Sequence, residues 1–124
     1  MGADVTHPAK GSQDASYAAV VASHDVDLTP TSWNCQSKKQ KGGVEYIRDM
    51  AEMTTNALNK FGKKMKKLPQ NIIMVRDGVG EGQFIPVLQK EANDMKKACA
   101  KLMSGYKPRI TFLVSDFSEL SLKG

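Results

Sequence analysis

Two long segments of the chain repeat apolar residues at three- and four-residue spacing, which predicts two amphipathic helices. The first helix is predicted over about residues 44–64, and a basic run followed by Pro69 favours its end. The second is predicted over about residues 83–104, with Gly105 as its stop. The inward positions are Val44, Ile47, Met50, Ala51, Ala57, Leu58 and Phe61 in the first, and Phe84, Val87, Leu88, Ala92, Met95, Cys99 and Leu102 in the second.

Shorter apolar runs predict strands before, between and after these helices. Residues 16–23 (SYAAVVAS) and 71–75 (NIIMV) fit buried strands, the second covered on both faces as in a parallel sheet. Residues 110–114 fit a last apolar strand, and residues 33–40 fit an exposed strand of poor alternation. Two strands followed by helix, strand, helix and strand indicate an α/β sheet with an antiparallel edge hairpin.

Length and composition indicate one globular domain, or part of one. The chain has 124 residues, of which 40% are hydrophobic and 25% charged. No apolar run approaches the roughly 20 residues that a membrane span requires, and the N-terminus lacks the features of a signal peptide. Two cysteines, Cys35 and Cys99, are too few for a disulfide framework. We therefore expect reduced thiols in a cytoplasmic or nuclear protein that has no membrane partner.

The formal net charge of +5 is unevenly distributed along the chain. Residues 1–62 carry 6 Lys/Arg and 7 Asp/Glu, whereas residues 63–124 carry 12 and 6. A basic half is compatible with a polyanionic partner, because lysines and arginines that meet phosphates release counterions. It is equally compatible with a solvated basic surface.

Asp77 is the residue with the most informative position. It ends an apolar strand and opens a loop that leads to a helix, and ligands of open α/β sheets gather at such strand ends. A carboxylate there suits Mg²⁺, which prefers oxygen ligands, although an aspartate that caps the turn is the alternative. Gly78, Gly80 and Gly82 match neither the dinucleotide fingerprint nor the phosphate loop, and rather favour tight turning or close approach of a phosphate to backbone amides.

Other catalytic arrangements find no support in the sequence. His7 and His24 have no metal-ligand spacing with each other or with the cysteines. No nucleophile motif is present for Ser-His-Asp or Cys-His catalysis.

Two motifs, GADVTHP at residues 2–8 and RDGVGEGQF at residues 76–84, closely resemble the Piwi domain of Argonaute proteins. The resemblance implies a ribonuclease-H-like mixed sheet with flanking helices, in which the first, fourth and fifth strands are parallel. It extends over about residues 2–114, through SYAAVVASHD (16–25), VEYIRDM (44–50), VLQKEANDMKKAC (87–99) and YKPRITFLV (106–114).

The resemblance also implies chemistry and partners. Members of the family bind a small guide RNA and a complementary target RNA, and some cleave the target with two Mg²⁺ ions held by an acidic tetrad. Matched by motif, three of the tetrad residues are Asp4, Glu45 and Asp77, with Asp4 and Asp77 as the metal ligands. Without the resemblance, Glu45 is an ordinary acid in a helix's first turn. Proteins of a silencing complex are further expected partners, and nucleic acid is expected along the loop and helix after Asp77.

The resemblance stops at Val114, before the family's fourth tetrad residue. We therefore interpret residues 1–114 as a partial Piwi domain, truncated at both ends, and residues 115–124 as a divergent polar tail. The leading hypothesis is an RNA-binding Piwi fragment in RNA-mediated gene silencing, with an incomplete cleavage site. One alternative is a metal-dependent endoribonuclease once the rest of the domain completes it. Another is a non-catalytic protein-interaction module that uses the two amphipathic helices.

Overall fold

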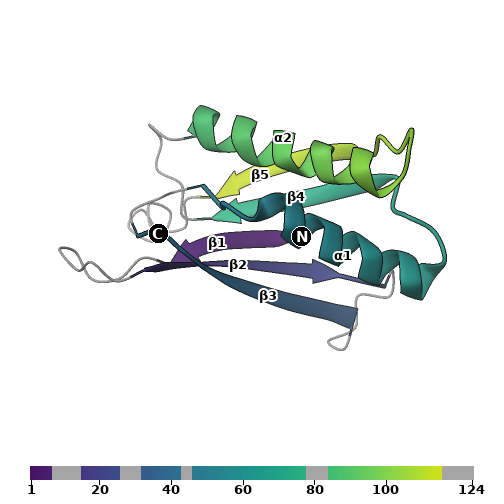
Figure 1. The fold of residues 1–124 in the computed structure, drawn as a ribbon, viewed down its shortest axis with the longest axis horizontal. Helices are drawn as coiled ribbons and strands as arrows, with labels where there is room; N and C mark the ends of the chain where they lie inside the picture. The colour runs from purple at the N-terminus through teal and green to yellow at the C-terminus, as the bar shows by residue number, and fades with distance from the viewer. Residues whose placement is uncertain (7–14, 26–31, 43–45, 78–83, 116–124) are drawn as a thin grey trace, which may run out of the picture.

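The computed structural model describes residues 1–6, 15–25, 32–42, 46–77 and 84–115 of the chain. Within these ranges it forms a five-stranded mixed sheet with two helices packed against it (Figure 1). The elements are β1 (Gly2–Thr6), β2 (Ser16–Ser23), β3 (Trp33–Gln40), α1 (Met50–Met65), β4 (Asn71–Asp77), α2 (Phe84–Leu102) and β5 (Arg109–Ser115). The α/β class predicted from the order of apolar runs is confirmed.

The strands follow one another across the sheet in the order β3-β2-β1-β4-β5. β1, β2 and β3 form an antiparallel meander, so the predicted edge hairpin is present. β4 lies parallel to β1 on one side and to β5 on the other. The short first strand is thus central, because the α1 crossover returns the chain to the free side of β1.

Both helices pack on the same face of the sheet and contact each other. The hydrophobic core lies between the helix layer and the sheet. It contains alternate residues of the inner strands together with side chains of the helix layer. These core residues are Ala3, Val5, Ala18, Val20, Ile72 and Met74 of the sheet, and Ile47, Met50, Met53, Leu58, Met95 and Cys99 of the helix layer. The period-2 burial of the strands follows from this one-sided cover.

The other face of the sheet is open in the part of the chain that the structure describes. Ile73 and Val75 on β4 are 56% and 37% exposed, and Leu113 on β5 is 52% exposed. The prediction that residues 71–75 are covered on both faces is therefore wrong for these residues. The buried strand predicted over 16–23 is likewise only half buried, since Tyr17 is 52% exposed. In both cases the reason is that the two helices share one face.

The first helix begins at Met50, six residues later than the periodicity predicts. The backbone before it is held by side chains instead of helical hydrogen bonds: the Ile47 N–H donates to Glu91, and the Arg48 N–H donates to Gln40. Ile47 is nevertheless fully buried, which explains why it fits the apolar stripe. The helix ends as predicted in the basic run, with Lys66 in the left-handed conformation (φ 61°).

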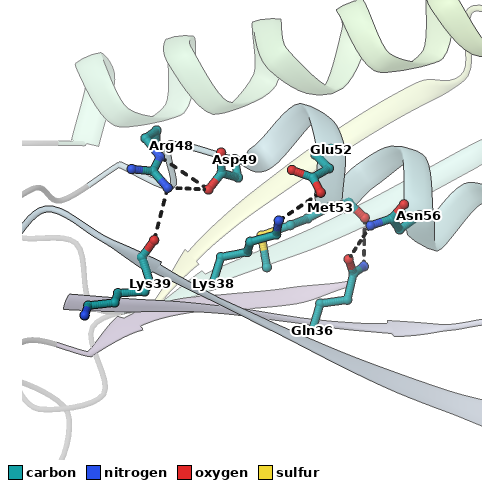
Figure 2. A network of polar contacts seen from close by, with 8 residues as sticks. All are labelled: Gln36, Lys38, Lys39, Arg48, Asp49, Glu52, Met53 and Asn56. Atoms are coloured by element: carbon teal, nitrogen blue, oxygen red, sulfur yellow. Dashed lines mark hydrogen bonds and ion pairs between the residues drawn. The ribbon is translucent and has the colours of Figure 1, made fainter. Parts of the chain in front are cut away.

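Polar side chains join β3 to α1 along a line that we call the β3–α1 seam (Figure 2). Gln36 donates to the Met53 carbonyl at 2.8 Å and accepts from Asn56 at 3.1 Å. Lys38 forms a 2.9 Å ion pair with Glu52. These contacts explain the poor apolar alternation of β3, because its residues that face α1 are amides and lysine rather than hydrocarbon.

Candidate metal centre

Asp4 and Asp77 lie on two central, parallel strands. The register pairs Gly2 with Val75 and Ala3 with Arg76. Continuing that register by one residue places Asp4 opposite Asp77, the last residue of β4. Ala3 and Arg76 are buried beneath the helices, so the next residues along each strand belong to the open face. Both predicted metal ligands therefore share one face of the sheet at the end of β4.

A buried ion pair lies directly beside Asp77. The Arg76 Nε donates to both carboxylate oxygens of Glu91, at 3.0 and 3.1 Å, and neither side chain has any exposed surface. Arg76 also donates from Nη1 to the Asp77 backbone carbonyl. Because guanidinium forks are rigid donors, this contact fixes the backbone at the end of β4 to helix α2.

Glu91 also organises the segment that follows Glu45. Its Oε2 accepts the Ile47 N–H at 3.0 Å. Burial raises the pKa of the Glu91 carboxyl, while Arg76 and the Ile47 amide act in the opposite direction. Gln40 completes the support, since its amide donates to the Tyr46 carbonyl at 2.9 Å and its Oε1 accepts from Arg48 at 3.1 Å.

Glu45 itself lies outside the residues that the structure describes, and so do the glycines of the loop after Asp77. The predicted roles of Glu45, Gly78, Gly80 and Gly82 therefore remain predictions. What the structure does give is the anchor of each segment: residues 46–48 behind Glu45, and Arg76 before the loop.

Sequence reasoning missed Arg76, Glu91 and Gln40 as supporting residues. A signal for Glu91 exists: it stands four residues after Val87 and four before Met95, on the apolar stripe of α2. A charged residue at such a position is buried only when it is paired. Arg76, at a buried position of an otherwise apolar strand, is the natural candidate for its partner.

The donor set fits a hard divalent cation in part. Two carboxylates side by side repel each other unless a cation lies between them, and Mg²⁺ is commonly held by one or two carboxylates plus waters and substrate phosphates. Among the described residues, no group of three or more His, Cys, Asp or Glu side chains forms a metal cage.

Three of the lysines that make the second half of the chain basic lie away from Asp77. Lys66 and Lys67 precede the first residue of β4, and Lys107 precedes the first residue of β5, whereas Asp77 ends β4. Because β4 and β5 are parallel, these lysines lie at the opposite end of the sheet (Figure 1). The lysines of α2, by contrast, follow Asp77 along the chain, as the sequence indicates.

No helix within the described ranges is both long and apolar enough to cross a membrane.

A mixed sheet of strand order 3-2-1-4-5 with two helices packed on one face is a ribonuclease-H-like arrangement. The Piwi domain family matches residues 1–116, and the chain belongs to that family. The Argonaute of Schizosaccharomyces pombe is 38% identical over 110 residues, which are 89% of this chain but 13% of that protein.

Solved structures agree with this assignment. The Argonaute of Kluyveromyces polysporus with a guide RNA has a TM-score of 0.81 at 29% identity, over 93% of this chain and 13% of that chain. The MID-PIWI domains of N. crassa QDE-2 have a TM-score of 0.76 at 30% identity, over 92% of this chain and 33% of that chain. Drosophila Piwi, at 20% identity and a TM-score of 0.69 over 91% and 15%, shares the fold. The chain thus spans a small part of the relatives that it matches.

Proposed function

We propose that this chain is the portion of an Argonaute-like Piwi domain that carries the first acidic residues of the metal centre and binds guide and target RNA in gene silencing. The observation that carries the proposal is the parallel β1–β4 register, which pairs Ala3 with Arg76, the residues directly before Asp4 and Asp77. The match to the Piwi family and the likeness to an Argonaute crystallised with a guide RNA support it. A cytoplasmic or nuclear location is proposed with it, consistent with the two free cysteines.

In this proposal Asp4 and Asp77 hold Mg²⁺, and Glu45 is a further acidic residue of the same centre. A bound divalent cation would polarise a phosphodiester and neutralise charge on its oxygens. The chain's own contribution is positional. Arg76 and Glu91 fix the end of β4 and residue Ile47. In this proposal they thereby position Asp77, which follows Arg76, and Glu45, which stands two residues before Ile47.

The first experiment measures cation binding by the full 124-residue chain, with Mn²⁺ as a paramagnetic probe that Mg²⁺ displaces. We expect Asp4→Asn and Asp77→Asn each to weaken Mn²⁺ binding at least tenfold, because each removes one of two adjacent anionic ligands. Glu52→Gln, which removes an exposed carboxylate from the β3–α1 seam, is the matched control and should leave the Mn²⁺ affinity unchanged. Equal Mn²⁺ affinity in all four proteins would contradict the proposed centre.

The second experiment measures binding of a labelled single-stranded RNA by fluorescence anisotropy. The affinity should fall steeply with added salt, since phosphate contacts release counterions, and should fall again when EDTA removes divalent cations. RNA binding that is indifferent to both treatments would rule out the proposed interface.

Cleavage and protein-interaction functions make different predictions. If the chain completes a nuclease together with the rest of a Piwi domain, Asp4→Ala and Asp77→Ala must each abolish cleavage by the assembled protein. If the chain is a non-catalytic interaction module, light scattering should show self-association or partner binding that neither substitution alters. The apolar faces of the two helices are buried in the core, so an interaction module would use the exposed apolar side chains of the open sheet face instead of the helices.

A further inference from the structure

The two edges of the sheet differ in how they are protected from another strand. Edge strand β3 carries Lys38 and Lys39 and is tied to α1 through the β3–α1 seam. Lysines on an edge oppose pairing with a further chain. Edge strand β5 pairs only with β4 in the described part of the chain, and its residues 110–114 (ITFLV) contain no charge. The β5 edge is therefore a ready template for an added strand.

A hollow of about 350 Å³ adjoins this edge, between α2 and the start of β5. Its walls include Ala100 of α2, Tyr106 and Pro108 of the connecting loop, and Ile110 of β5. A residue paired with Ile110 on an added strand would face the same side of the sheet as Ile110. The hollow has room for an apolar side chain of such a strand, so backbone pairing and side-chain burial would act together.

The charge around the hollow indicates the chemistry of the partner. Lys96 and Lys107 line it, and residues 96–109 hold four lysines and one arginine but no acidic residue. The side chains of these five basic residues are exposed. A partner segment with acidic residues would therefore be attracted to this edge, and a basic one repelled.

We propose that the β5 edge and its hollow form a docking site for an extended segment of a partner protein in which acidic and apolar residues alternate, added as a sixth strand beside β5. A nucleic acid is the less suitable occupant, because it offers no peptide backbone to pair with a strand and no aliphatic side chain to fill the hollow. The site lies away from Asp4 and Asp77, and goes beyond the RNA-binding function proposed above.

The test uses the full chain and a fluorescein-labelled probe peptide, Glu-Val-Glu-Phe-Glu-Val-Glu, in fluorescence anisotropy. We expect the same peptide with lysine in place of glutamate to bind at least tenfold more weakly. A version N-methylated at alternate residues should also lose at least tenfold, because it cannot donate the strand's hydrogen bonds. Equal binding of the N-methylated peptide would overturn strand addition.

Two variants of α2 separate docking into the hollow from simple charge attraction. Ala100→Arg fills the hollow from an exposed helical position and adds a positive charge. Gln89→Arg adds the same charge at an exposed position three helical turns away, about 16 Å along the axis. We expect Ala100→Arg to weaken peptide binding at least tenfold and Gln89→Arg to leave it within twofold. If both variants strengthen binding, or if a polyuridylate displaces the peptide from both equally, the surface is a general polyanion site and the proposal fails.

Amide hydrogen exchange on the unmodified chain provides a measurement that needs no variant. The peptide should slow exchange across residues 110–114 at least tenfold and leave β3 unchanged. Unchanged exchange in β5 at saturating peptide, or no binding at all, would also overturn the proposal.

Discussion

Two groups of polar contacts hold the helix layer to the sheet, and they differ in their access to water. In the β3–α1 seam, Lys38 and Glu52 pair at 2.9 Å with side chains that are 41% and 53% exposed. Arg76 and Glu91 pair at 3.0 Å with no exposed surface. The distances are nearly equal, so the geometry of the contact does not separate them. The two pairs differ in the folding free energy that is lost when one partner is removed. This loss is small for an exposed pair and large for a buried pair.

The largest effect is expected from breaking the buried pair. Arg76→Met leaves the Glu91 carboxylate buried without its guanidinium, and should lower the free energy of unfolding by about 3–5 kcal/mol. Denaturant unfolding at pH 7 measures this loss. The matched variant Arg76→Met/Glu91→Gln removes both charges and keeps an acceptor for the Ile47 N–H. It should recover most of the stability, and an equal loss in the double variant would mean that packing, not charge, is at stake.

The pH dependence of the Arg76→Met variant provides a second check. Burial raises the Glu91 pKa, and Arg76 opposes the rise, so removing Arg76 moves the folded-state pKa further up. The folded state then binds a proton that the unfolded state has released, over the range above the ordinary carboxyl pKa. Stability of this variant should therefore increase as the pH falls towards that ordinary value, and decrease as the pH rises. A variant whose loss is the same at pH 5 and pH 8 would contradict this account.

Replacing a buried polar group that has no hydrogen-bond partner should raise the stability of the chain instead of lowering it. The Thr54 hydroxyl on α1 is fully buried and has no hydrogen-bond partner among the described residues. Thr54→Val replaces it with a methyl group of similar size, and should stabilise the chain by about 1–2 kcal/mol. A rise in the denaturant midpoint measures this gain. Thr55→Val is the control: its hydroxyl donates to the Ala51 carbonyl at 2.9 Å, and the substitution should bring no comparable gain.

Breaking the exposed ion pair of the β3–α1 seam should have only a small effect on stability. Lys38→Met or Glu52→Gln breaks the ion pair of the β3–α1 seam, and each should lower stability by no more than about 1 kcal/mol. The same loss should shrink further in high salt, which screens exposed charges. A double-mutant cycle of these two substitutions isolates the pair. A coupling energy as large as that of Arg76 and Glu91 would erase the distinction between the two regions.

The same distinction explains what the sequence does and does not predict. Periodicity finds both helices and strands β2, β4 and β5 because they bury hydrocarbon, and a helix or strand period is visible in apolar letters alone. It misses the short β1, which only the family resemblance implies. It misplaces the start of α1, because residues 46–48 are held by hydrogen bonds with the Gln40 side chain on β3 and with Glu91 on α2, and apolar periodicity does not register such contacts. Motif resemblance points to Asp4 and Asp77, while the parallel register of β1 and β4, which pairs the residues directly before them, is a property of the folded sheet.

Tyr106 is intermediate in exposure between the β3–α1 seam and the buried pair of Arg76 and Glu91. Its substitution should have the smallest effect. Its hydroxyl donates to the Pro69 carbonyl at 2.5 Å, and burial raises its pKa from the ordinary 10.0 to about 12. The folded chain therefore keeps a phenol proton that the unfolded chain loses, so this residue's contribution to stability is present below pH 10 and is lost as the pH rises through about 12. In a titration followed by tyrosinate absorbance, Tyr106→Phe should remove a step centred near pH 12 and leave the earlier part of the curve unchanged. Circular dichroism at each pH establishes that the chain is still folded where the step occurs. If the unmodified chain shows no step near pH 12, the Tyr106 hydroxyl is as open to water as the β3–α1 seam.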